Sequence, residues 1–339
     1  MLSAIFDDAA GSPKRKVIGV GAGLAGANLL AWAWALIAFH DRPLLLGPAM
    51  LAYGFGLRHA VDADHIAAID NVTRKLMAEG KRPVSVGLFF SLGHSTVVFA
   101  LSALVAATTS ALEGRFGAFK AVGGLIGTGV SVIFLFAIAA ANATILAATW
   151  RSLRAARRGD AVAEADAPLA GGLLGRLFAR LFRLVRRSGH MYPLGLLFGL
   201  GFDTATEIGL LGTAALGASS GLSPWTILVF PALFSAGMAL VDTADGILML
   251  GAYGWACVDP SRKLAYNLGI TAVSVLVAVA VGGVEALGLL AGRFGLDGGF
   301  WRAIGTVNGE LGTVGYAIVA LFALAWLASL ALFRFGRKA

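Results

Sequence analysis

Charged side chains are scarce in this chain. Asp, Glu, Lys and Arg together make up 14% of its 339 residues, whereas a soluble domain usually carries about 25%. Hydrophobic residues make up 58%, and the mean hydropathy is +0.81. Apolar windows of about 20 residues, the length of helix that crosses a bilayer, recur along the sequence. The composition therefore excludes an ordinary soluble domain and predicts an all-α integral membrane protein.

Cysteine is almost absent, because Cys257 is the only one. A single thiol excludes an intrachain disulfide and any metal site built from several thiolates of one chain. A metal bound here would therefore have nitrogen and oxygen ligands. The sequence also lacks the phosphate loop of ATP-driven pumps and the His-Glu-x-x-His pattern of metalloproteases. We therefore expect no ATP as partner, no bound cofactor and no enzyme active site.

Eight apolar windows are long enough to cross the hydrocarbon core as helices. They cover residues 17–39, 45–69, 84–107, 121–149, 191–216, 224–249, 264–290 and 311–333. The polar residues 1–16 precede an apolar run that is too long for a cleavable signal, so we expect this run to remain as a membrane anchor. The sequence predicts about eight transmembrane helices in one domain, residues 1–339.

Lys and Arg are distributed unequally between the two sides of these windows. Most of the 27 basic residues lie on the side that carries both chain termini, so we predict that the N- and C-termini are cytoplasmic. The longest connection, 150–190, is predicted to be a cytoplasmic basic loop between two four-helix halves. Its expected role is to set the orientation of the protein in the membrane and to contact lipid headgroups, and the alternative is a regulatory role. Because the net charge of +8 is spread over short loops, we expect a lipid bilayer and no nucleic acid as partner. The expected location is the plasma (inner) membrane, with several passes.

Ionisable side chains inside a membrane are expensive and mark functional sites, and here they gather in four of the windows. The candidate metal ligands are His59, Asp62, Asp64, His65, His94, Asp203, Glu207, Asp242 and Asp245. Neutral imidazole suits nickel, cobalt, copper and zinc, whereas an all-oxygen cage would suit magnesium or calcium. The mixture predicts a transition-metal site. The alternative is a fixed network that joins the helices, in which carboxylates orient the histidines without touching metal.

Helical geometry limits how the second window can bind an ion. His59 and His65 lie about 120° apart around a regular helix, so one straight helix cannot easily aim both rings at one ion. Either the helix unwinds locally, which Gly54 and Gly56 would ease, or only part of the cluster binds metal directly. We favour local unwinding. Arg58 is interpreted as a charge partner, because a guanidinium cannot coordinate a metal.

The two halves of the chain echo one another weakly. The second and third windows carry polar motifs, and the fifth and sixth windows carry similar ones. Because these pairs are three spans apart, the second pair would cross the membrane in the opposite direction to the first. This pattern is typical of an inverted repeat, which places a transporter's binding site near the middle of the membrane.

Four motifs, taken together, resemble the signatures of the nickel/cobalt transporter family. They are His59-Ala-Val-Asp62-Ala-Asp64-His65, Gly93-His94-Ser95-Thr96, Leu200-Gly-Phe-Asp203-Thr-Ala-Thr-Glu207 and Gly237-Met followed by Asp242-Thr-Ala-Asp245. The resemblance implies an eight-span secondary permease with cytoplasmic termini that imports nickel or cobalt ions as substrate. It also implies that His59, Asp62, Asp64 and His65 form the selectivity motif and that the other candidates support it.

Two other functions remain as alternatives. The first is nickel or cobalt efflux, although exporters that resemble this family tend to carry a His-rich cytoplasmic loop, and the loop here has only His190. The second, a membrane metalloenzyme, lacks a matching motif. The sequence leaves open the choice between nickel and cobalt, proton coupling and the oligomeric state.

Overall fold

The structure is a computed structural model. It describes residues 7–8, 13–107, 185–200, 210, 221–256 and 260–311, with scattered positions between 125 and 154 and between 317 and 324. Every regular element in this described part is a helix. The predicted all-α class is confirmed to that extent.

Four of these helices contain stretches long and apolar enough to cross a membrane. The stretches are Lys14–Ala38, Val86–Leu104, Pro224–Tyr253 and Thr271–Phe294. They belong to α2 (Pro13–Ala38), α5 (Val86–Ala107), the pair α10 (Pro224–Ile227) and α11 (Val229–Ala256), and α12 (Pro260–Phe294). Each overlaps a predicted window, and their ends differ by at most seven residues. The other windows are interrupted or lie partly outside the described residues, so eight spans stay a prediction.

The second predicted span, 45–69, is two helices rather than one. A short 3-10 turn, η1 (Pro43–Leu45), leads into α3 (Leu46–His59), and α4 (Ala63–Ala78) follows after three residues. At the break, Asp62 adopts an extended backbone conformation and its side chain accepts a hydrogen bond from the backbone N–H of Ala63 at 2.7 Å. Asp is a favoured N-cap because its side-chain oxygen satisfies one of the exposed N–H groups of the first turn. The expected local unwinding is confirmed.

The two glycines upstream of this break do not cause it. The unwound residues lie after His59, whereas Gly56 is inside α3 and faces α11. A Cβ built on Gly56 would lie 2.0 Å from the carbonyl oxygen of Phe234. Gly56 therefore permits close packing of two helix backbones, as small residues do between membrane helices.

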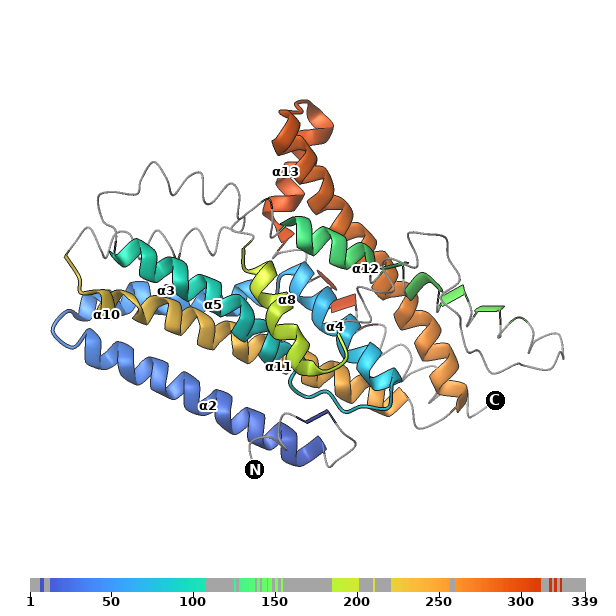
Figure 1. The fold of residues 1–339 in the computed structure, drawn as a ribbon, viewed down its shortest axis with the longest axis horizontal. Coiled ribbons are helices and arrows are strands. Elements are labelled where there is room, and N and C mark those ends of the chain that lie inside the picture. The colour runs from blue at the N-terminus through green and yellow to red at the C-terminus, as the bar shows by residue number, and fades with distance from the viewer. Residues whose placement is uncertain are drawn as a thin grey trace.

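Helix α11 lies at the centre of the arrangement and contacts α2, α3, α4 and α5. Helix α8 (Met191–Phe198), which follows the 3-10 turn η2 (Ser188–His190), packs against α5. In Figure 1, α2, α3, α5 and α11 run alongside one another, while α12 runs at a steep angle to them and projects beyond them together with α13 (Gly299–Gly309). The interrupted α3–α4 pair is thereby held against α11 and α5.

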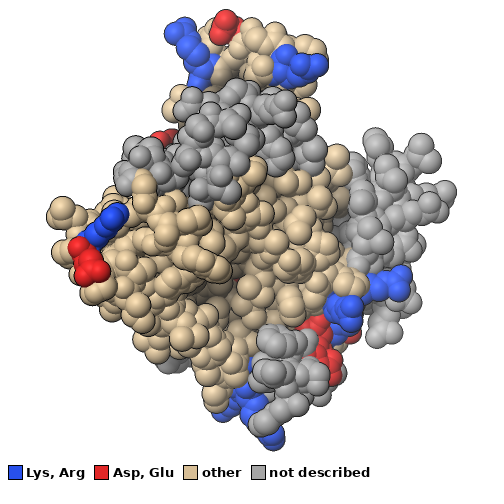
Figure 2. Space-filling view, turned by 60° about the vertical axis from the view of Figure 1, so that its left-hand side comes forward, with Lys and Arg blue, Asp and Glu red and all other residues tan. Residues whose placement is uncertain are grey.

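Charged side chains on the face drawn in Figure 2 lie at its edges, and a broad uncharged surface separates them. Large apolar side chains are exposed to the surroundings on several helices, including Leu29, Leu30 and Ile37 of α2. Exposed apolar surface of this extent marks an interaction site, and on long apolar helices lipid is the matching solvent.

Several backbone and charged groups meet at the C-terminal end of α4. The Lys75 ammonium donates to the carbonyl of Val185 at 2.5 Å, and Lys81 donates to that of Arg186 at 2.6 Å. The Asp8 carboxylate accepts hydrogen bonds from the N–H and hydroxyl of Ser188, both at 2.6 Å. The N-terminal segment and the segment before α8 thus lie at one end of the molecule, as the charge distribution predicts for two connections on one side of a membrane.

Candidate functional site

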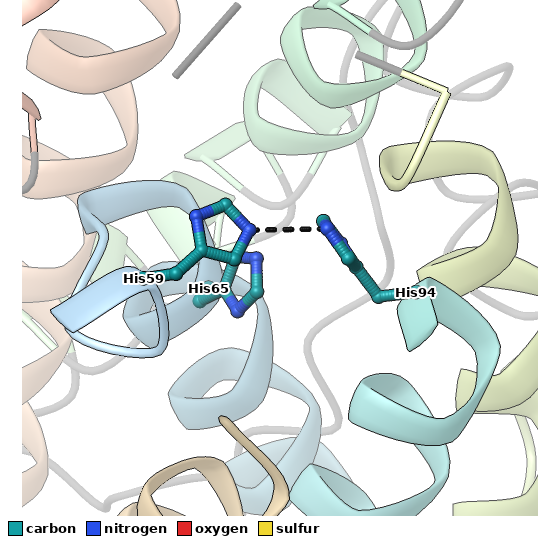
Figure 3. Close-up of side chains that lie close together, drawn as sticks. All are labelled: His59, His65 and His94. Carbon is teal, nitrogen blue, oxygen red and sulfur yellow. Dashed lines mark hydrogen bonds between the residues drawn. The ribbon is translucent and has the colours of Figure 1, made fainter. Parts of the chain in front are cut away.

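Three buried histidines from three helices meet at the break between α3 and α4. His59 ends α3, His65 lies in the first turn of α4, and His94 lies in α5. Each offers a ring nitrogen, and these atoms all lie within 4.8 Å of one another. Figure 3 shows the His59 and His94 rings facing one another, with Nε2 atoms 3.0 Å apart, and His65 beside them.

The break is what lets two histidines of one segment meet. In a continuous helix they would point about 120° apart, but here the ring centroids of His59 and His65 are 4.8 Å apart. The extended backbone at Asp62 redirects the chain, so that the end of one helix and the start of the next face the same point. Of the two alternatives that the sequence leaves open, local unwinding and partial binding by the cluster, the structure contains the local unwinding.

Asp242 of α11 supplies a carboxylate to this cluster. Its Oδ1 lies 3.3 Å from Nδ1 of His65, and the Asp242 side chain is fully buried. Its Oδ2 has no hydrogen-bond partner among the described residues. Gly87 lets the backbone of α5 approach that of α11 beside Asp242, because a Cβ there would lie 1.9 Å from the Asp242 carbonyl oxygen. A buried carboxylate oxygen without a donor is costly, and a cation beside it would remove that cost.

Asp62 and Asp64 each use one carboxylate oxygen at the start of α4. Asp62 Oδ1 accepts from the N–H of Ala63 at 2.7 Å, and Asp64 Oδ1 accepts from the N–H of His65 at 2.8 Å. Asp64 also interacts electrostatically with His94 and Asp242. Both aspartates therefore fix the turn that carries His65.

Of the other predicted ligands, one lies on α11 and two lie beyond the described part of the chain. Asp245 follows Asp242 by one helical turn, and its Oδ2 has no hydrogen-bond partner among the described residues. The predicted ligands Asp203 and Glu207 lie outside the described residues. Arg58, which its spacing of four residues suggested as a charge partner of Asp62, lies instead with Nη2 4.0 Å from the carboxylate of Glu310.

Aromatic rings enclose the histidines. The Phe90 ring centroid lies 4.7 Å from that of His65, and the Phe234 centroid lies 5.4 Å from that of His59. Both phenylalanines are fully buried. Such walls exclude water and strengthen electrostatic interactions inside the site.

Two buried acids were missed by the sequence reasoning. Asp70 of α4 is fully buried, and Glu285 of α12 is nearly so and accepts a hydrogen bond from Ser131 at 2.8 Å. A signal existed for Glu285, which is a carboxylate inside the window 264–290. Asp70 lies one residue beyond the end of the window 45–69, so a count restricted to the windows omits it.

The donor set has a definite chemical preference. Three imidazole nitrogens with one or more carboxylate oxygens suit a borderline divalent transition metal. Metal–imidazole bonds in zinc sites are about 2.1 Å long, so two such ligands at a right angle would lie about 3.0 Å apart. The Nε2 atoms of His59 and His94 are 3.0 Å apart and form a hydrogen bond between the two rings. An ion held by both nitrogens would replace this hydrogen bond.

Comparison with known proteins agrees with this chemistry. Residues 45–332 match the family described as High-affinity nickel-transport protein. The chain is 53% identical over 340 residues to the high-affinity nickel transport protein of Cupriavidus necator, covering 99% of this chain and 97% of that one. It is 56% identical over 315 residues to the hydrogenase nickel incorporation protein HupN of Bradyrhizobium diazoefficiens, covering 92% and 82%.

A further relative is named for the other metal. The chain is 42% identical over 295 residues to the cobalt transport protein NhlF of Rhodococcus rhodochrous, covering 84% of this chain and 82% of that one. No solved structure matches the chain with significance.

Proposed function

The chain belongs to the high-affinity nickel-transport protein family, a family of transporters rather than enzymes, and we propose that it imports nickel ions, with cobalt as a second substrate. The observation that carries the proposal is the meeting of His59, His65 and His94 with Asp242 at a helix break between apolar helices. This donor set favours nickel and cobalt over magnesium and calcium. The relatives named for nickel and for cobalt support both metals.

We infer that the protein lies in the plasma membrane with about eight spans and both termini in the cytoplasm. The basic end formed around α4 and the long apolar helices support this placement. Inward movement of a dication then runs down the membrane potential, which supplies about 4.6 kcal/mol per 100 mV. ATP is not needed for import.

The helix break suggests how access alternates. A hydrated ion entering from outside exchanges water for imidazole and carboxylate groups at the site. Because α3 and α4 are separate rods joined at Ala60–Asp62, α4 can tilt against α11 while α3 stays packed on it. Discontinuous helices of this kind carry the ion sites of many secondary transporters. Asp62 and Asp64 would keep His65 oriented during this movement.

Radiolabelled nickel uptake tests the proposal. Cells expressing the chain are compared with cells expressing His59→Ala and His40→Ala at matched protein levels. His40 is exposed and lies outside the cluster, so His40→Ala is the matched histidine control. We expect accumulation with the parent chain and the control and its loss with His59→Ala, and competition by unlabelled cobalt ranks the two metals. Full uptake by His59→Ala would reject the site, and lower cellular nickel on expression would indicate export.

A further inference from the structure

A second polar cluster lies beyond the histidines, where α4, α11 and α12 meet. At its centre is Asp70, five residues after His65 and fully buried. One carboxylate oxygen accepts a hydrogen bond from the hydroxyl of Tyr253, and the other accepts one from the hydroxyl of Ser274 at 3.0 Å. At the rise of an α-helix, Asp70 lies about 7.5 Å farther along α4 than His65, toward the basic end of the molecule.

No basic side chain neutralises Asp70 by direct contact. Among the described residues, none of the ion pairs within 4.0 Å includes it. Arg74, one turn farther along α4, instead donates to the hydroxyl of Thr271 and to the side-chain oxygen of Asn71, both at 2.8 Å. The guanidinium thus closes the far side of the cluster and acts on Asp70 only from a distance.

Two further carboxylates connect this cluster to the histidines. Asp245 interacts electrostatically with both Asp70 and Asp242. Its neighbour Gly246 places α11 directly against α4, because a Cβ there would lie 3.5 Å from Cγ2 of Ile69. The Oδ2 atoms of Asp242 and Asp245 are inaccessible to solvent and lack hydrogen-bond partners among the described residues. Three carboxylates therefore follow the interface of α4 and α11, and the unsatisfied Oδ2 of Asp245 is not explained by a cation at the histidines.

A network with unsatisfied buried carboxylate oxygens would destabilise the fold if its only role were structural. A structural network is stable only when its buried polar atoms are satisfied, and like charges raise its cost. Asp70 itself meets the first condition through Tyr253 and Ser274, whereas Asp245 and Asp242 do not. A divalent cation between these carboxylates would supply the missing positive charge.

We propose that Asp70 and Asp245 form a second, inner station for the transported cation, with the hydroxyls of Tyr253 and Ser274 holding Asp70 in position. The inference rests on the proposed import function. The station offers only oxygen ligands, which bind nickel and cobalt less tightly than imidazole does. An ion selected at the histidines would pass to a weaker site nearer the cytoplasm and leave from there.

Equilibrium dialysis of the purified full-length chain against radiolabelled nickel tests the inference. The parent chain is expected to bind one ion tightly and a second ion more weakly. Asp70→Asn keeps the shape of the side chain and one of its two acceptor oxygens while removing the charge, so it should lose the weaker ion and keep the tight one. His59→Ala should lose the tight ion. Asp297→Asn, in the exposed connection after α12, is the matched control and should bind as the parent does.

Uptake kinetics provide the second measurement. Asp70→Asn should lower the maximal uptake rate by about tenfold and leave the half-saturating nickel concentration within about twofold, because selection at the histidines is unchanged. If Asp70→Asn fails to fold, Asp245→Asn is judged by the same two measurements. Saturation of the parent at one ion per chain, or two ions and parental rates in both variants, would overturn the inner station. No nickel binding by the parent would instead overturn the proposed function.

Discussion

At the scale of single residues, some side chains of the predicted site are expected both to bind the metal and to orient a neighbouring ligand. His65 presents one ring nitrogen near Asp242 and its ring near those of His59 and His94. A carboxylate on the second nitrogen of a metal-binding histidine fixes the tautomer and the ring orientation. Asp242 is therefore expected to act on the metal both through His65 and through its own unsatisfied oxygen.

Replacing Asp242 with Asn tests this double role. The amide keeps the volume and removes the charge, so we expect nickel affinity to fall by about 10- to 100-fold, the usual effect of losing such a partner. The measurement is the nickel dissociation constant of the purified protein. Asp297→Asn is the matched control, because it removes the charge of one exposed aspartate away from the histidine site. An unchanged dissociation constant in Asp242→Asn would show that His65 needs no carboxylate.

At the scale of helices, the hydropathy pattern predicted where several membrane helices lie, and the angle between His59 and His65 around a regular helix pointed to the break between α3 and α4. Apolar windows fix where α2, α5 and α12 lie because the need to cross hydrocarbon is a local property of the sequence. The angle between His59 and His65 favoured a break in the helix over partial binding by the cluster, and the break is present. The partner of Gly56 could not be predicted in this way, because it depends on which helix lies opposite, and neither could the contacts of Asp70 with α11 and α12.

The two glycines of α3 give a direct test of this packing. Gly56→Ala places a Cβ 2.0 Å from the Phe234 carbonyl oxygen, so α3 must move away from α11. Gly54→Ala meets nothing within 4 Å and gains helix propensity worth up to about 1 kcal/mol. We expect Gly56→Ala to lower the apparent melting temperature in detergent and nickel uptake, whereas Gly54→Ala retains both. Equal melting temperatures for the two variants would contradict the close contact of α3 with α11.

At the scale of the whole molecule, the structure and the sequence contribute different information. The structure brings Asp8, Arg82 and Ser188 together at one end, which matches the predicted grouping of basic connections. The side of the membrane on which this end lies is predicted from the charge distribution. Sidedness matters for function, because the inner station leads to the cytoplasm only if the basic end is cytoplasmic.

Cysteine labelling can test the sidedness, because the chain has a single native cysteine to remove. In a Cys257→Ser background, the exposed residues Asp41, Asp297 and Arg82 are replaced one at a time by Cys. Asp41 and Asp297 lie in connections predicted to be outside, so a membrane-impermeant maleimide should label both in intact cells. Arg82→Cys, at the basic end, should be labelled only after permeabilisation. The opposite pattern would place the Asp70 station on the outer side, where it would receive the ion before the histidines do and would act in capture rather than in release.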